Sequence, residues 1–146
     1  MRWGAILLEK HKPLRISGIV EAPGENTDLL VTQFLKNNLE VDCTIMDIKL
    51  SHRIGRSQDG LKRSIIVKFA SYRKREEVFA KKKLLKKTGF VVSEDLTASR
   101  YQIYKQYCEE YRKSNVWTLD GRINIIDKNG KRRVVDVLNY ANGNKN

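Results

Sequence analysis

The sequence predicts an α+β protein of two modules, and three kinds of pattern support this. Short runs of alternating apolar and polar residues indicate strands, apolar residues at helical spacing indicate helices, and clusters of Gly, Pro, Asn and Asp separate them. The pattern changes after Asp95, so we expect a first module over residues 13–95 and a smaller second module over residues 96–138. Residues 1–12 form a lead-in without a clear period, and the polar tail at 139–146 is expected to fray.

The pattern of the first module predicts six elements in the order β-α-β-β-α-β, which is the ferredoxin-like arrangement. Pro23 stops the first strand, Asn26 or Thr27 caps the first helix, Ser71 caps the second helix, and Gly89 ends it. The predicted strands cover residues 14–20, 47–54, 63–70 and 90–93, the predicted helices cover residues 26–38 and 71–89, and a turn-rich hairpin loop covers residues 55–60.

The second module is predicted to be a small α-β-β(β) unit of one helix and two or three strands. Thr97 can cap the helix, and aromatic residues spaced at i, i+3, i+7 and i+10 indicate a buried helix face. Asp120–Gly121 predicts a two-residue hairpin turn, and Asn129–Gly130 repeats the device. The stripe consists of Tyr101, Tyr104, Cys108 and Tyr111, and the strands cover residues 116–119, 122–126 and 131–135.

The charge of the chain indicates a polyanionic partner. The 146 residues include 29 Lys and Arg against 17 Asp and Glu, a formal charge of +12, while 40% hydrophobic residues suffice for a core. Between Lys62 and Lys87 only Glu76 and Glu77 oppose eleven Lys or Arg residues. The basic run continues through Lys81–Lys83 and Lys86–Lys87; the alternative is that it is only the solvated face of a helix.

Alternation predicts two different faces for the strand at residues 63–70. Ile65, Val67 and Phe69 share a face that can be buried. The opposite face, which is expected to stay open and cationic, carries Lys62, Ser64, Ile66 and Lys68.

Catalytic, metal and membrane functions find no support in the sequence. Two cysteines and two histidines lack ligand spacing, and no Gly-rich phosphate loop or nucleophile motif is present. We therefore expect no enzyme, no cofactor or metal, and no small-molecule substrate. No apolar stretch reaches the roughly 20 residues that a membrane span needs, so we expect no membrane partner and an intracellular protein of the cytoplasm, the nucleus or both.

A four-stranded unit with a basic surface resembles an RNA-recognition motif. In that family the first and third strands present aromatic side chains on which bases stack. Here the outward positions hold Arg15 in the first strand and Ser64 and Ile66 in the third. The resemblance therefore implies that recognition by the sheet rests on Arg15, Arg53 and Lys68.

A series of short motifs is more specific than the fold, and over residues 14–135 it resembles the C-terminal domain of the baculovirus FP (few-polyhedra) protein and the related first-open-reading-frame proteins of insect LINE-type retrotransposons. The motifs, in order, are Arg15-Ile16-Ser17-Gly18, Ser51-His52-Arg53-Ile54-Gly55-Arg56, Arg63-Ser64-Ile65-Ile66-Val67-Lys68-Phe69, Arg73-Lys74-Arg75, Ser93-Glu94-Asp95-Leu96-Thr97 and Val116-Trp117-Thr118-Leu119-Asp120-Gly121-Arg122-Ile123.

This resemblance implies a protein that binds single-stranded RNA and DNA, acts as a nucleic-acid chaperone and coats a transcript in a ribonucleoprotein particle. Relatives of this kind usually trimerise through an N-terminal coiled coil, which residues 1–12 cannot supply. We expect any self-association to occur without that coiled coil.

The leading hypothesis is a non-enzymatic, weakly sequence-selective binder of single-stranded nucleic acid, either RNA or DNA. Trp117 is the candidate for base stacking, with packing as its alternative, and His52 either contacts a base or packs on the sheet. The alternatives for the whole chain are a protein–protein interaction module and a truncated retroelement relic without function. The candidate nucleic-acid-binding residues are Arg15, Arg53, Arg56, Lys62, Lys68, Arg73, Lys74, Arg75, Trp117, Lys131, Arg132 and Arg133.

Overall fold

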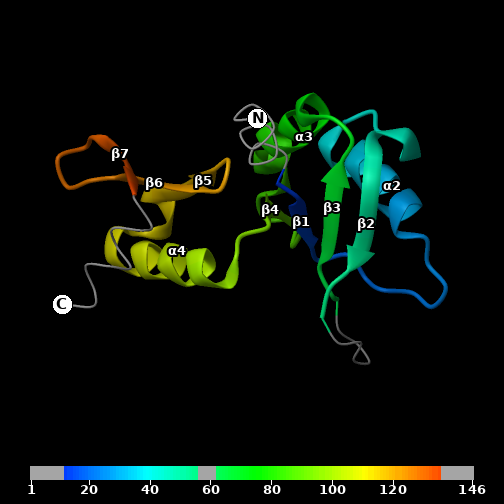
Figure 1. Cartoon of the computed structure of the whole chain (residues 1–146), viewed down its shortest axis with the longest axis horizontal. Helices are drawn as coiled ribbons and strands as arrows, with labels where there is room; N and C mark the ends of the chain where they lie inside the picture. The colour runs from blue at the N-terminus through cyan, green and yellow to red at the C-terminus, as the bar shows by residue number, and fades with distance from the viewer. Residues whose placement is uncertain (1–11, 56–61, 136–146) are drawn as a thin grey trace, which may run out of the picture. The chain divides into compact units, whose positions relative to one another are not determined.

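The chain divides into two compact units, Met1–Asp95 and Leu96–Asn146, and is of the α+β class. The computed structural model describes residues 12–55 and 62–135 (Figure 1). Each unit contains one antiparallel sheet, of four strands in the first and three in the second. The lead-in up to residue 11, Arg56 with most of the predicted hairpin loop, and the tail from residue 136 lie outside the described residues.

The first unit has the predicted order of strands and helices, with short 3₁₀ segments added. Its sheet has the order β2-β3-β1-β4, and every neighbouring pair is antiparallel. The elements are β1 (Leu14–Ser17), α2 (Thr27–Leu39), η1 (Ile45–Asp47), β2 (Ile48–Arg53), β3 (Ile65–Phe69), α3 (Tyr72–Ala80), η2 (Lys81–Leu85) and β4 (Val91–Glu94).

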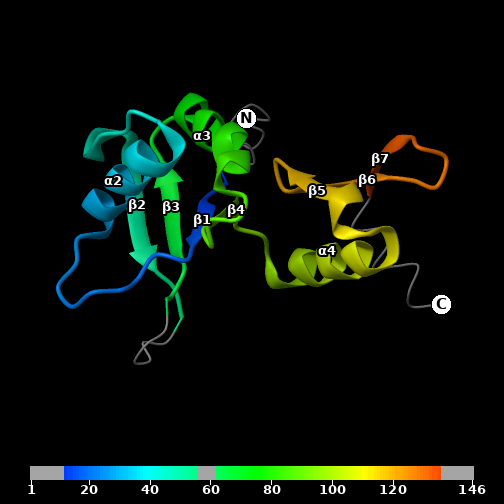
Figure 2. The same cartoon turned by 180° about the vertical axis from the view of Figure 1, so that it is seen from behind.

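Both helices of the first unit contribute to the core on one face of the sheet. α2 lies behind β2 and β3 in Figure 1 and in front of them in Figure 2. Ile65, Val67 and Phe69 of β3 are buried on this face, as alternation predicts. The core is completed chiefly by Leu14, Ile16, Val31, Phe34, Leu35, Leu39, Ile48, Val78, Phe79 and Val92.

Two predicted boundaries of the first unit are wrong for local reasons. The first strand ends at Ser17 instead of residue 20, because Gly18 has φ +107°, which interrupts the extended backbone. A Cβ at this position would lie 2.6 Å from the Gly89 carbonyl oxygen, so the site requires glycine. The second helix is α-helical only to Ala80 and continues as the 3₁₀ segment η2. Lysines at i, i+3 and i+4 along residues 81–87 repel one another in an α-helix, which favours this early end.

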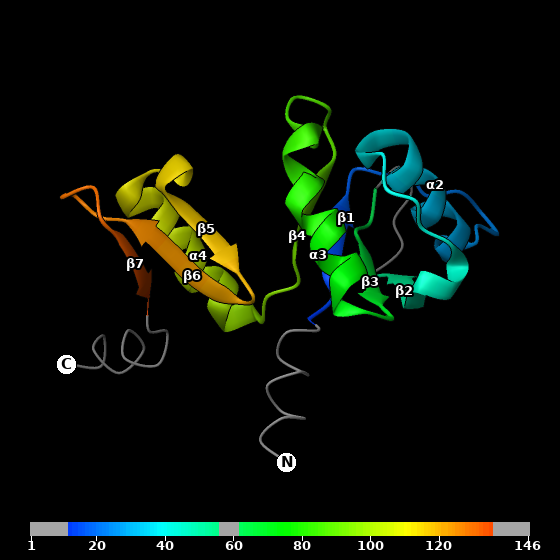
Figure 3. The same cartoon turned by 90° about the horizontal axis from the view of Figure 1, so that it is seen from above.

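The second unit consists of α4 (Ala98–Tyr111), η3 (Lys113–Asn115), β5 (Val116–Leu119), β6 (Arg122–Ile126) and β7 (Arg132–Val135). The strands lie in the order β5-β6-β7, and α4 runs along one face of the sheet (Figure 3). Asp120 and Gly121 have φ of 51° and 77°, the positive values that the predicted two-residue hairpin requires. The turn between β6 and β7 spans residues 127–131, so the two-residue turn predicted at Asn129–Gly130 is wrong, and of this pair only Gly130 has a positive φ (79°). The Asp127 carboxylate accepts hydrogen bonds from the backbone N–H groups of Asn129 and Lys131 and closes this longer turn.

The small core of the second unit lies between α4 and the sheet. Tyr104, Cys108 and Tyr111 of the predicted stripe pack against buried Ile103, Val116, Ile123, Ile125 and Val135. Tyr101 was predicted to join them, but it is 49% exposed. At 100° per residue, Tyr101 lies roughly a quarter-turn from the centre of the buried helix face, and Tyr107 packs there instead.

Candidate nucleic-acid interface

The face of the first sheet opposite its helices carries the first group of candidate residues. The cross-strand register places one residue of each strand in a single row, namely Ser93, Arg15, Ile66 and His52. Arg15 lies on this face as predicted, but it is not an isolated cation, because its Nη2 atom donates to Asp95 Oδ1 at 3.0 Å. Lys68 lies on the same face and is partly exposed.

This face is less cationic than the sequence suggested. Ile66 was assigned to the open face and does point there, yet it is only 6% exposed. β3 has a neighbouring strand on each side, so its side chains are covered more than those of the edge strands. His52, on the edge strand β2, is exposed, with its Nδ1 atom 3.1 Å from the Arg53 carbonyl oxygen.

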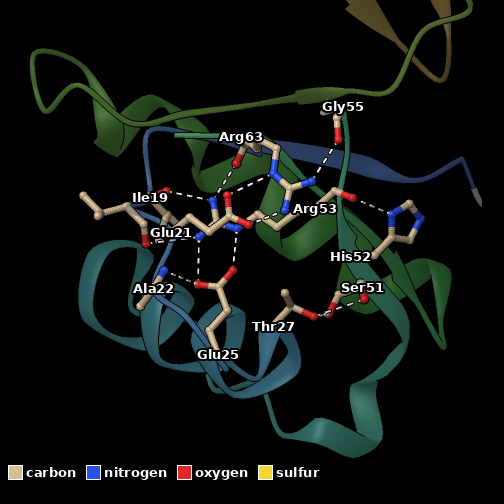
Figure 4. Close-up of polar contacts among 11 residues, drawn as sticks. Ile19, Glu21, Ala22, Glu25, Thr27, Ser51, His52, Arg53, Gly55 and Arg63 are labelled. Atoms are coloured by element: carbon tan, nitrogen blue, oxygen red, sulfur yellow. Dashed lines mark hydrogen bonds and ion pairs between the residues drawn. The ribbon is translucent and has the colours of Figure 1, made fainter. Parts of the chain in front are cut away.

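Arg53 was expected to take part in recognition from the open sheet face, but its side chain lies on the other side of the sheet. A bulge between Ile48 and Leu50 reverses the alternation of β2, so Arg53 pairs with Ile65 and points to the helix-facing side. Its side chain is 4% exposed, and its Nε atom donates to Glu25 Oε1 at 2.7 Å (Figure 4). The guanidinium also donates to the carbonyl oxygens of Ile19, Val20 and Arg63.

Arg63 forms a second ion pair of this kind, with Glu21, which was not predicted from the sequence. Its guanidinium donates to both carboxylate oxygens of Glu21 and to the Gly55 carbonyl oxygen (Figure 4). The hydrogen bonds from Arg63 and from Arg53 lower the pKa of Glu21 and of Glu25, respectively. The two arginines thus tie the segment between β1 and α2 to the hairpin of β2 and β3, which is a structural role.

The basic cluster Arg73-Lys74-Arg75 divides into one exposed residue and two engaged ones. Arg75 was a candidate nucleic-acid-binding residue, but it is 1% exposed, and its Nη2 atom donates to buried Glu94 at 2.6 Å. Lys74 Nζ donates to the Asp42 carbonyl oxygen and to Glu77. Arg73 is exposed and remains available for a phosphate contact.

Several of the lysines that follow α3 are exposed. Lys83, Lys86 and Lys87 are exposed, and none of them takes part in an ion pair within residues 12–55 and 62–135. Lys82 lies 3.9 Å from the centroid of the Phe79 ring, and burial lowers the pKa of its ammonium group. We call residues 81–87 the lysine segment. The charge run is visible in the sequence, but its lysines are not among the candidate nucleic-acid-binding residues.

The remaining candidates lie at strand ends and in the second unit. Lys62 is exposed just before β3. Trp117 of β5 is partly exposed, and the Arg132 guanidinium carbon of β7 lies 5.7 Å from the centroid of its ring. Lys131, Arg132 and Arg133 are all exposed.

Within residues 12–55 and 62–135, no three His, Cys, Asp or Glu side chains gather as a metal site, and no helix is long and apolar enough to cross a membrane. Cys43 and Cys108 are not in disulfides. Burial, helped by Asp47, raises the pKa of the Cys43 thiol to about 11, which disfavours the nucleophilic thiolate.

No protein-family model matches the sequence, and no curated protein matches it.

Proposed function

We propose that this protein binds single-stranded nucleic acid, RNA or DNA, through phosphate contacts, and that it does so without catalysing a reaction. The carrying observation is the lysine segment, whose Lys83, Lys86 and Lys87 are exposed and outside any ion pair among the described residues. A polyanion stabilises cations that otherwise repel one another. When lysines bind the phosphates of a nucleic acid, the condensed counterions are released, which favours binding.

The architecture of the first unit supports an RNA-recognition-motif-like domain as the scaffold. The element order with the strand order β2-β3-β1-β4 agrees with that proposal, as does the packing of both helices on one sheet face. The open face carries Arg15, His52 and Lys68 where such domains present aromatic rings. We therefore propose weak sequence selectivity, since phosphate contacts position a strand but do not read its bases.

The resemblance to FP-type and retrotransposon proteins extends this proposal to chaperone activity in a ribonucleoprotein particle. A second candidate, a protein-interaction module, is favoured by one observation: Ile45 and Met46 of η1 are 52% and 82% exposed. Exposed apolar side chains of this size are typical of protein contacts when they occur together.

Replacing Lys83, Lys86 and Lys87 together with alanine is expected to weaken RNA binding without changing the melting temperature, because all three side chains are exposed. If each contacts one phosphate, the slope of log affinity against log salt becomes shallower by about 2, at roughly 0.7 per contact with a single strand. Fluorescence anisotropy of a labelled oligonucleotide over a salt series measures this slope.

The matched control replaces Lys36, Lys105 and Lys113 together with alanine. These lysines are also exposed, and their replacement removes the same total charge. This control is expected to change the slope much less. Equal slopes for the two triple variants would show that net charge alone matters, and the lysine segment would then lose its assigned role.

A further inference from the structure

The second sheet has a face that α4 does not cover. The helix covers one side of this sheet (Figure 3), and the residues that it packs against are Val116, Ile123, Ile125 and Val135. Since side chains alternate along strands, the opposite face carries the cross-strand row Trp117, Asn124 and Val134. Arg132 also belongs to this face, opposite Ile126.

Three side chains of this face are fixed relative to one another. Arg132 donates from Nε and Nη2 to Asn124 Oδ1, at 3.3 and 3.2 Å. Asn124 is 1% exposed, and its Nδ2 atom donates to the Arg122 carbonyl oxygen, which orients the amide. The amide thereby holds the Arg132 guanidinium over Trp117, at 5.7 Å from the ring centroid.

The surroundings of this group favour an anionic ligand. Residues 116–135 contain five Lys or Arg residues and two Asp residues. The Asp127 carboxylate is occupied by two backbone N–H groups of its own turn. Arg132 is exposed next to the ring, and Val134 adds an apolar, half-exposed surface on the same face.

We propose that Trp117 and Arg132 form a binding site for one unpaired nucleobase and its phosphate, a proposal that rests on the function proposed above. The indole ring and the guanidinium plane each offer a flat surface for stacking, and the positive charge of Arg132 pairs with the phosphate. A nucleotide combines a flat ring system with a negative charge. An acidic protein surface offers the negative charge without the flat ring. In a duplex the faces of the bases are covered by their neighbours, so this site selects single strands.

The test uses the full chain with Trp3→Phe, which leaves Trp117 as its single tryptophan. Its fluorescence is followed during titration with oligouridylate and, separately, with inorganic polyphosphate, a polyanion without bases. We expect oligouridylate to quench the Trp117 emission and polyphosphate to bind without quenching it. This readout needs no substitution within the site.

In the same background, Trp117→Leu is expected to lower the affinity for oligouridylate by about fivefold to a hundredfold, the usual contribution of one stacked base, and to leave the polyphosphate affinity unchanged. Trp117→Phe keeps a ring and is expected to retain most of the affinity. Arg132→Gln is expected to weaken oligouridylate binding more than Lys113→Gln, which removes the same charge at another exposed position of this unit.

The failures of the two proposals differ. If the Trp3→Phe chain binds oligouridylate without quenching of the Trp117 emission, the base site is overturned and single-strand binding remains intact. Equal quenching by polyphosphate would also overturn the base site, since stacking would not be its cause. Absence of oligouridylate binding by the unsubstituted chain would overturn both.

Discussion

Replacing Arg75 with alanine is expected to destabilise the first unit by about 3–5 kcal/mol, the usual cost of removing one partner of a buried ion pair. Glu94, whose side chain is fully buried, would lose the guanidinium that lies 2.6 Å from its Oε2 atom. Arg75 also donates to the Lys12 carbonyl oxygen at 2.7 Å, so the segment before β1 would lose an anchor. Urea denaturation followed by circular dichroism measures the change in the free energy of unfolding.

Two further variants separate the ion pair from the charge. Arg73→Ala removes the same charge from the exposed side of α3 and is expected to change the stability by less than about 0.5 kcal/mol. Combining Arg75→Met with Glu94→Leu replaces both partners by apolar groups and should recover much of the loss. An unchanged unfolding midpoint for Arg75→Ala would contradict the buried position of the guanidinium.

Replacing Phe69 with alanine is expected to cost about 3–5 kcal/mol, because a buried aromatic side chain leaves both lost transfer energy and a cavity. Phe69 is 5% exposed, pairs with Ile48 across the sheet and belongs to the main core. The same denaturation experiment measures the effect. Leu50→Ala is the control, because Leu50 is 42% exposed on the edge strand, and it should cost far less. Similar losses for the two variants would contradict the assignment of sheet faces.

Local patterns were sufficient to predict most of the secondary structure. Alternation in β3 identified Ile65, Val67 and Phe69 as core residues, and all three are buried. Ser71 and Thr97 cap α3 and α4 through their hydroxyl groups, as predicted from their positions. Asp120–Gly121 identified the hairpin of the second unit because few residue pairs adopt two positive φ angles.

The candidate site was harder to predict, because charge alone does not tell whether an arginine is exposed. A single bulge in β2 turns Arg53 from the open face to the helix-facing side, and the sequence of β2 carries no clear signal for it. Arg75 is buried and pairs with Glu94, which lies 19 residues away in the sequence. No local sequence pattern indicates this partner. Both arginines satisfy carbonyl and carboxylate oxygens inside the fold.

The most direct test of single-strand binding is the affinity of the intact chain for a single-stranded RNA oligonucleotide, measured over a salt series from roughly 50 to 200 mM. If about five phosphates are neutralised, the log–log slope is about −3.5 and the affinity falls roughly a hundredfold over this range. A duplex of the same length, measured in parallel, is expected to bind more weakly. Absent binding, or an affinity that does not change with salt, would contradict the phosphate-binding function and leave the protein-interaction module as the better account.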